Sequence, residues 1–235
     1  MKAVILAGGK GTRLRPYTVF IPKPLVPLGE DSIIEIILRQ LEKNDIEHVY
    51  IALGYLAELL KAYFSQLNHK YKMEISFSHE EEPLGTIGPI KRISGLDETF
   101  LVLNGDILTT LSFKDLIDFH KRQGTIATVA VHSRKVEIDY GVIDVSRDLR
   151  ILKHREKPVL EYMVGMGICV FEPKILDYIP ENRKYDIPDL ISCLIENGQK
   201  ISAYVSDDYW MDIGRPDDYE QAVKDYTASP VKFIT

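Results

Sequence analysis

The sequence predicts an α/β protein in three layers, with a mostly parallel sheet between helices. Three observations predict this class: short, fully apolar segments of strand length, segments with helical periodicity between them, and glycine-rich turns where strands end. Strands of a parallel sheet are buried on both faces, so they read as continuous apolar runs that alternate with amphipathic helices. A chain of 235 residues suits one large domain, and we predict a single domain over 1–235.

The first half of the chain shows this alternation most clearly. Residues 2–7 form an apolar run that ends in glycines, which predicts a buried strand and a turn. Residues 32–43 place apolar side chains at helical spacing behind Ser32, a good N-cap residue. In the same way, further strands are predicted at 48–53, 73–78, 100–103 and 125–132, and further helices at 57–64 and 113–122.

After about residue 133 the pattern changes to short strands separated by turns. Strands are predicted at 141–144 and 164–171, and helices at 188–197 and 216–226; the tail 229–235 is expected to be a terminal strap or a frayed end. The sequence shows no Ser/Gly-rich linker, repeat or low-complexity segment. We therefore expect the second half to elaborate the same sheet.

Composition excludes several classes of protein. Hydrophobic residues make up 45% and charged residues 27% of the chain, the balance of an ordinary globular protein. No apolar run approaches the ~20 residues that span a bilayer, so we expect no membrane segment. Cys169 and Cys193 lack a C-x-x-C spacing and form no disulfide framework, which favours the reducing cytoplasm. A net charge of −6 argues against a nucleic-acid partner.

The charge is unevenly distributed along the chain. Residues 1–29 contain five basic residues and no acidic one, whereas the remainder carries 24 bases against 35 acids. A basic, glycine-rich beginning on an acidic body suggests a local anion site, although a solvated basic surface has the same composition.

The loop after the first strand carries the most informative motif. It reads Leu6-Ala-Gly-Gly-Lys-Gly-Thr-Arg-Leu-Arg-Pro16, and Ile21-Pro-Lys-Pro-Leu25 follows closely. Open α/β sheets bind ligands at this edge, glycines let backbone N–H groups approach phosphate oxygens, and Arg13 can bind phosphate with both guanidinium arms. A Walker A loop would need Ser or Thr after Lys10, and a dinucleotide fingerprint would need a third glycine at Leu14. A simple glycine turn is the alternative.

This stretch resembles the start of the sugar nucleotidyltransferases, also called NDP-sugar pyrophosphorylases. Further segments match that family in order: Glu80-Glu-Glu-Pro-Leu-Gly-Thr86, Leu103-Asn-Gly-Asp106, Tyr140-Gly141-Val142, Glu156-Lys-Pro158 and Trp210-Met-Asp-Ile-Gly214. Each short motif is weak, but the ordered set is specific and covers residues 1 to about 226. The chain is most similar to mannose-1-phosphate guanylyltransferases, and the resemblance stops before the left-handed β-helix that many members carry.

The resemblance implies a fold, a cofactor and roles for particular residues. The fold would be the Rossmann-like one of nucleotide-diphospho-sugar transferases, with 1–132 binding the nucleotide and 133–235 the sugar phosphate. Asp106 and Asp212 would hold Mg²⁺, and Arg13 and Lys23 would be catalytic. The nucleotide would lie along Leu6, Ala7, Gly8, Gly9, Gly11, Thr12, Arg13, Gly85, Thr86, Asn104 and Asp106, and the sugar phosphate along Gly141, Glu156, Lys157 and Gly165.

The implied reaction joins a nucleoside triphosphate to a sugar-1-phosphate and releases pyrophosphate. GTP with mannose-1-phosphate or a related sugar phosphate is the preferred pair, and uridylyl, thymidylyl or cytidylyl transfer stays open. Gly165 stands where relatives commonly have Asn, which leaves the sugar open. Two other classes also remain: a catalytically silent nucleotide-sugar sensor, and a glycosyltransferase of the GT-A type, which usually needs an Asp-x-Asp motif that is missing at Asp106. Homo-oligomerisation is left open.

Overall fold

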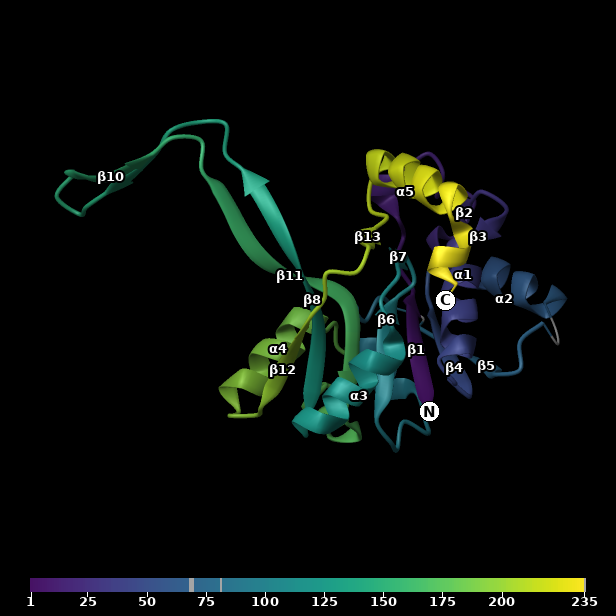
Figure 1. The fold of residues 1–235 in the computed structure, drawn as a ribbon. Coiled ribbons are helices and arrows are strands. Elements are labelled where there is room, and N and C mark those ends of the chain that lie inside the picture. Colours follow the sequence, from purple (N-terminus) through teal and green to yellow (C-terminus); the bar gives the residue numbers. More distant parts are fainter. Residues whose placement is uncertain (68–69, 81, 235) are drawn as a thin grey trace.

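The computed structural model describes residues 1–67, 70–80 and 82–234 and has the predicted α/β architecture (Figure 1). Its centre is a sheet of seven strands in the order β12-β8-β11-β6-β1-β4-β5. All neighbours in this sheet are parallel except β11, which runs antiparallel to both β6 and β8. The predicted fold class, a mostly parallel mixed sheet, is therefore confirmed. The seven strands are β1 (Lys2–Ala7), β4 (His48–Leu53), β5 (Glu74–His79), β6 (Phe100–Asn104), β8 (Ala127–Glu137), β11 (Val159–Phe171) and β12 (Ile201–Val205).

Helices cover both faces of this sheet and form two separate apolar cores. The helices are α1 (Ile33–Lys43), α2 (Ala57–Gln66), α3 (Phe113–Gln123), α4 (Ile187–Glu196) and α5 (Pro216–Ala228). Helices α1, α2, α3 and α5 contribute to one core, and α4 packs with two short 3₁₀ segments in the other. Alternate residues of β1 point to opposite sides, so Ile5 lies in the first core and Val4 in the second.

Local sequence signals explain where several elements begin and end. Ser32 accepts a hydrogen bond from the Glu35 N–H, and Glu35 accepts one from the Ser32 N–H, which completes a capping box on α1. Helix α3 begins after Ser112 and ends at Gly124, which adopts a left-handed conformation. The predicted terminal strap is present as a 3₁₀ turn, Pro230–Phe233, and Phe233 packs against Tyr209 and Tyr226.

Short strand pairs lie beside the main sheet. Strand β7 (Ile107–Thr109) pairs with β13 (Trp210–Asp212), and β2 (Pro27–Leu28) pairs with β3 (Asp31–Ser32). These pairs fall outside the predicted elements, because two or three residues are too few for a strand pattern to be visible. The β7–β13 pair brings two distant parts of the chain to one edge of the sheet.

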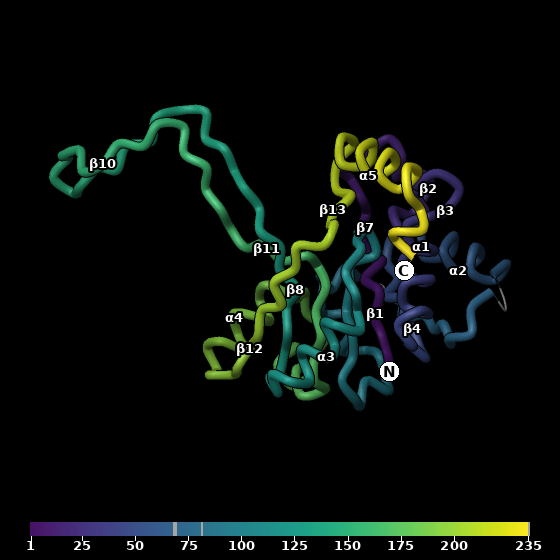
Figure 2. The backbone as a smooth tube through the Cα atoms, in the orientation of Figure 1, coloured from purple at the N-terminus to yellow at the C-terminus, as the bar shows by residue number. Residues whose placement is uncertain are grey.

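Strands β8 and β11 are longer than predicted and leave the body of the molecule as a ribbon. They remain paired as far as Glu137 and Val159, and β9 (Val142–Val145) and β10 (Ile151–Arg155) form a further pair at the tip. Figures 1 and 2 show this ribbon projecting far from the helices. We call residues 133–165 the arm.

Candidate functional site

A cavity of about 750 Å³ opens at the carboxyl ends of the central strands. Turns after β1, β4, β5 and β6 form most of its wall, and β13 and the segment before α4 complete it. This is the edge at which open α/β sheets bind their ligands. The lining residues are Leu6, Ala7, Gly8, Gly9, Lys10, Arg13, Lys23, Pro24, Ala52, Gly54, Tyr55, His79, Glu80, Pro83, Gly85, Thr86, Pro89, Asn104, Gly105, Asp106, Lys184, Asp186 and Asp212.

The glycine loop after β1 packs closely against the end of β4. The Tyr55 N–H donates to the Gly8 carbonyl at 3.2 Å. A Cβ on Gly54 would lie 2.7 Å from the Gly8 carbonyl oxygen, and a Cβ on Gly8 would lie 2.6 Å from Glu80 Oε1. Gly54 therefore requires glycine, because its neighbour is backbone, whereas at Gly8 the flexible Glu80 side chain could move aside. Gly9 differs from both, because a Cβ there would meet none of the described residues within 4 Å.

This contrast predicts the effect of two matched substitutions. Gly54→Ala should lower the free energy of unfolding by about 1–3 kcal/mol, since the new methyl group overlaps rigid backbone at Gly8. Because that backbone lines the cavity, the same change should also raise the KM for the nucleotide that the sequence motifs lead us to expect there. Denaturant unfolding and steady-state kinetics measure the two effects. Gly9→Ala is the stability control, and equal destabilisation by both changes would contradict this packing argument.

Gly11 and Thr12 shape the loop without lining the cavity. Gly11 has a φ of 59°, and its carbonyl accepts a hydrogen bond from Thr18 Oγ1 at 2.7 Å. Thr12 then begins a 3₁₀ turn, Thr12–Leu14, which includes Arg13. The left-handed conformation at Gly11 turns the chain, so that the Arg13 side chain reaches the cavity.

Strands β7 and β13 bring Asp106 and Asp212 to the same place. Asp212 is paired with Ile107, and the Ile213 N–H donates to the Asp106 carbonyl at 3.0 Å. The position that a Cβ on Gly214 would occupy is 3.5 Å from both Arg13 Nη2 and Asp212 Oδ2. The guanidinium and the carboxylate thus flank one glycine.

Lys23 joins this cluster from the segment after the glycine loop. Its ammonium forms an ion pair with Asp106 Oδ2, and its side chain is only 9% exposed. The Pro24 that follows also lines the cavity. Arg13, Lys23, Asp106 and Asp212 therefore lie together, although they come from three separate parts of the chain.

The carboxylate pair fits a divalent cation. Asp106 Oδ1 is buried and has no hydrogen-bond partner among the described residues. Burial raises the pKa of Asp212 and the nearby Asp106 carboxylate raises it further, while Lys23 and Arg13 oppose the rise. No three His, Cys, Asp or Glu side chains gather into a metal cage anywhere in the described ranges. Two carboxylates, water and substrate phosphates are the ligands that Mg²⁺ prefers.

The raised pKa of Asp212 has a consequence for stability. A carboxyl group that binds its proton more tightly in the folded state destabilises that state once pH rises above its ordinary value of 3.8. Asp212→Asn should therefore raise the Tm of the metal-free protein at neutral pH, but only slightly, because Asp212 is exposed and solvent screens its repulsion from Asp106. Thermal melts in EDTA measure this, with the exposed Asp207→Asn as control. A variant that melts below the wild type would contradict the assignment.

Gly85 and Thr86 line the cavity and lie in a turn that is hydrogen-bonded to the start of α4. The Thr86 N–H donates to Asp186 Oδ1 at 2.7 Å, and Thr86 Oγ1 accepts from the Ile187 N–H at 2.9 Å. A Cβ on Gly85 would lie 2.5 Å from the Tyr185 carbonyl oxygen. Gly85 is among the residues expected along the nucleotide, but the space that its Cβ would fill is occupied by the chain's own backbone.

The predicted sugar-phosphate residues lie outside the cavity wall. Gly141, Glu156 and Lys157 are on the arm, and Gly165 lies at its base. The arm does bring part of this set together, because a Cβ on Gly141 would lie 3.1 Å from Glu156 Oε2. The structure thus places the predicted metal residues, and the predicted nucleotide residues other than Gly11 and Thr12, around one cavity, and the predicted sugar residues elsewhere.

Several lining residues were missed by sequence reasoning. Glu80 stands beside Gly8 and Gly54 and accepts a hydrogen bond from the Leu84 N–H at 2.9 Å, while burial raises its pKa. Its place in the Glu80–Thr86 motif was the available signal, although Glu81 of that motif lies outside the described residues. Lys184 and Asp186 had no signal, since they follow no motif and reach the cavity through tertiary folding alone.

Burial raises the pKa of Cys169 to about 12, so its thiol stays protonated at neutral pH, as expected for an inert core residue. Cys193 lies half-buried in α4. Among the described residues, no helix combines the length and the apolar character needed to cross a bilayer.

Comparison with known proteins matches residues 2–229 to the family model described as "Nucleotidyl transferase". A UTP–glucose-1-phosphate uridylyltransferase of Synechocystis sp. is 34% identical over all of this chain and 65% of its own length. A mannose-1-phosphate guanyltransferase of Candida albicans is 35% identical over 93% of this chain and 62% of its own length. The chain thus spans less than two thirds of the length of these relatives.

Solved structures of known proteins share the fold of this chain. HddC from Yersinia pseudotuberculosis is 26% identical with a TM-score of 0.74, and the match covers 96% of this chain and 99% of that one. A putative glucose-1-phosphate thymidylyltransferase from Bacillus anthracis, 22% identical, shares the fold with a TM-score of 0.76 over 95% and 94% of the two chains. The resemblance seen in the sequence is confirmed: this chain belongs to the nucleotidyl transferase family, among the sugar nucleotidyltransferases.

Proposed function

We propose that the chain is a Mg²⁺-dependent sugar-1-phosphate nucleotidyltransferase. One observation supports this proposal most strongly: two basic and two acidic side chains line one cavity beside the glycine loop. They are Arg13, Lys23, Asp106 and Asp212. Two cations and two carboxylates there match the requirements of a reaction between two polyanions. The family and its named relatives support the same reaction class.

In the proposed reaction an oxygen of the sugar-1-phosphate attacks the α-phosphorus of the nucleoside triphosphate. A new P–O bond forms, the bond between the α-phosphorus and the bridging oxygen breaks, and pyrophosphate leaves with that oxygen. The attacking phosphate is already anionic at neutral pH, so no side chain has to remove a proton. The protein must instead align the two phosphates and offset their repulsion.

Roles for individual residues follow from their positions. Backbone N–H groups of the glycine loop would bind the triphosphate, and Arg13 would stabilise the charge that develops on the departing pyrophosphate. Lys23, held by Asp106, would neutralise the α-phosphate. Asp106 and Asp212 would hold Mg²⁺, which when bound supplies charge neutralisation at the phosphates. Lys157 and Glu156 are proposed to bind the sugar phosphate and the sugar hydroxyls.

For the base and the sugar, we propose a guanine nucleotide with mannose-1-phosphate or a similar hexose phosphate. The named mannose-1-phosphate guanyltransferases among the relatives support this choice, as does a second structure of Yersinia HddC, which is complexed with GMP-PN. The Synechocystis uridylyltransferase, at similar identity, makes UTP with glucose-1-phosphate the main alternative.

A matrix of four nucleoside triphosphates against several sugar-1-phosphates, read as pyrophosphate release, tests the function. The expected result is Mg²⁺-dependent release that requires both substrates and is fastest with GTP. Binding of a nucleotide sugar without release from any pair would instead indicate a sensor. Transfer of the sugar to an acceptor, without pyrophosphate exchange, would indicate a glycosyltransferase.

A further inference from the structure

A second cavity, of about 690 Å³, lies at the end of the sheet opposite the cavity beside the glycine loop. Three loops form its wall: 120–126 at the end of α3, 172–174 after β11, and 198–200 between α4 and β12. They lie where β8 and β12 begin, whereas the cavity beside the glycine loop lies where β1, β4, β5 and β6 end. Figure 1 shows these loops at the lower end of the molecule, towards the N-terminus. We call this space the rear cavity.

Hydrogen bonds join the three loops of the rear cavity to one another. The Ile126 N–H donates to the Lys200 carbonyl at 3.2 Å, and the Glu172 N–H donates to the Ile126 carbonyl at 3.0 Å. The Thr125 hydroxyl donates to Ser202 Oγ of β12 at 3.1 Å. The fold therefore forms this cavity without a ligand, and its volume falls in the range of small-molecule sites, about 300–1,000 Å³.

A buried histidine and a carboxylate lie side by side in the wall of the rear cavity. The His120 side chain is 1% exposed; its Nδ1 lies 2.8 Å from Thr128 Oγ1, and its Nε2 lies 3.0 Å from Glu172 Oε1. The Thr99 hydroxyl donates to the same carboxylate oxygen at 2.7 Å. Among the described residues that line this cavity, Glu172 is the only acidic one, and its side chain is 39% exposed. Its carboxylate is thus fixed in position and still accessible to a ligand.

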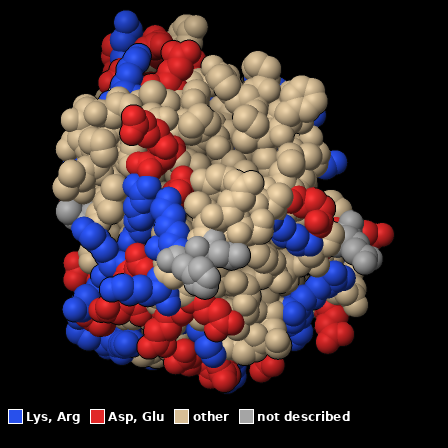
Figure 3. Space-filling model, turned by 90° about the vertical axis from the view of Figure 1, so that its right-hand side faces the viewer, with Lys and Arg blue, Asp and Glu red and all other residues tan. Residues whose placement is uncertain are grey.

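Three exposed lysines, Lys121, Lys174 and Lys200, make the rear cavity positively charged. No ion pair between their ammonium groups and a carboxylate is found in the described part of the chain. Three ammonium groups against one carboxylate leave an excess of two positive charges, in a chain with a net charge of −6. By contrast, acidic and basic residues are mixed over the lower part of the side shown in Figure 3. An unbalanced group of like charges around a cavity attracts an anion into it.

We propose that the rear cavity is a second binding site, which takes a small phosphorylated sugar or polyol. A phosphate monoester carries close to two negative charges at neutral pH, which matches the excess charge of the lysines. Hydroxyl groups of the ligand would donate to the Glu172 carboxylate and bond to the amide of Gln199, which also lines the cavity. A nucleic acid fits less well, because the chain is acidic overall and its three lysines border a cavity of small-molecule size.

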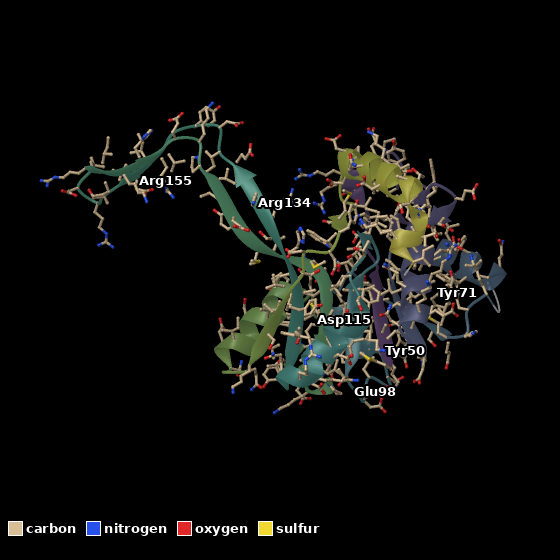
Figure 4. The ribbon with its side chains drawn as sticks, viewed as in Figure 1. Tyr50, Tyr71, Glu98, Asp115, Arg134 and Arg155 are labelled. Atoms are coloured by element: carbon tan, nitrogen blue, oxygen red, sulfur yellow. The ribbon has the colours of Figure 1, made fainter. Side chains whose placement is uncertain are left out.

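The rear cavity is separate from the residues assigned to the proposed reaction. It lies at the ends of β8 and β11 that are opposite the arm, since β8 begins after 125–126 and β11 ends before Glu172. Figure 4 shows Arg134 and Arg155 on the arm, apart from Asp115 of α3 in the body of the molecule. None of the residues that line the rear cavity lines the cavity beside the glycine loop. A ligand in the rear cavity should therefore bind without displacing a nucleotide or a sugar phosphate.

Amide NMR spectra of the full chain locate the binding site without reference to activity. Gly124 and Gly198 line the rear cavity, whereas Gly9 and Gly54 line the cavity beside the glycine loop. Glucose 6-phosphate, titrated at constant ionic strength, should shift the signals of Gly124 and Gly198 until they saturate, and glucose should not. Inorganic phosphate should bind there more weakly, because it offers no sugar hydroxyls, and equal affinity would refute the sugar part of the proposal. Shifts confined to Gly9 and Gly54, or no saturable shift, would overturn it.

Replacing the three lysines together by alanine tests the source of the affinity. The dissociation constant of glucose 6-phosphate, measured from the same signals, should rise at least about tenfold, because three charged contacts are lost. A control variant loses the same charge at exposed lysines that line neither cavity, and it should keep the wild-type affinity: Lys43→Ala, Lys114→Ala and Lys224→Ala. An equal loss of affinity in both variants would show a general effect of charge and would overturn the proposed site.

Two further variants separate this site from the proposed active site. Gln199→Glu keeps the lysines but adds a carboxylate to the wall of the rear cavity, so it should also weaken binding of glucose 6-phosphate. Arg13→Ala alters only the cavity beside the glycine loop and should leave that binding unchanged. Tight binding to Gln199→Glu, or lost binding in Arg13→Ala, would overturn the proposal. Because binding is measured without turnover, a chain that releases no pyrophosphate would refute the proposed function alone.

Discussion

Asp106→Asn is expected to abolish Mg²⁺-dependent turnover, with kcat lower by a factor of at least ~10³. The substitution keeps the shape of the side chain but removes the charge that would hold the cation. Asp106 Oδ1, the oxygen not paired with Lys23, has no hydrogen-bond partner within the described part of the chain. Pyrophosphate release measured against Mg²⁺ concentration checks the effect, with Asp207→Asn as the matched control. An unchanged Mg²⁺ titration curve would show that Asp106 does not bind the metal.

The same substitution should also destabilise the fold. The loss of stability can be separated from the loss of turnover. Lys23 loses its partner and is left as a nearly buried charge, which for a fully buried pair costs about 3–5 kcal/mol. Because Asp106 is 24% exposed, we expect the lower end of that range or less. Adding Lys23→Met to Asp106→Asn should restore the free energy of unfolding without restoring activity.

Arg13→Ala is expected to lower kcat by about 10³, with a smaller change in the KM for the nucleotide. The guanidinium is positioned beforehand by the Gly11 turn, next to Asp212, and would act on charge that develops only as pyrophosphate leaves. Steady-state kinetics at saturating Mg²⁺ measure the change. Arg15→Ala, an exposed neighbour outside the cavity wall, is the control. Near-normal kcat in Arg13→Ala would remove this residue from the mechanism.

The core of the fold was predictable because its signals are local. The apolar run at 2–7 and the helical spacing behind Ser32 each specify one element, and the observed β1 and α1 match them within one residue. The order of buried runs and amphipathic segments then specifies a mostly parallel sheet. The antiparallel direction of β11 could not be predicted, since it depends on how the chain returns between β6 and β8.

The arm could not be predicted for a different reason. Strand patterning at 125–132 and 164–171 follows burial within the sheet, and beyond those limits the strands are exposed. The alternation of Val136, Tyr162 and Val164 with polar neighbours is a valid strand signal, but it does not reveal which surface covers it. The interpretation of 133–235 as one sugar-binding half did not anticipate a projecting ribbon.

Two parts of the site could be predicted well from the sequence: the glycine loop after β1 and the acidic residue after β6. Asp106 follows a buried strand, and the structure places it beside Lys23 at the cavity. Asp212 has no comparable local signal, since β13 is three residues long and its pairing with β7 is a tertiary event. Its assignment as a metal ligand rests on the family resemblance and stays a prediction; the structure places Asp212 near Gly214 together with Arg13.

The most direct test of the central claim is an anomalous-scattering measurement on crystals grown with Mn²⁺ and a non-hydrolysable nucleoside triphosphate. We predict one strong peak between the carboxylates of Asp106 and Asp212, in contact with the α-phosphate and beside Arg13. A cation bound elsewhere, or a triphosphate that lies outside the cavity bordered by the glycine loop, would contradict the account.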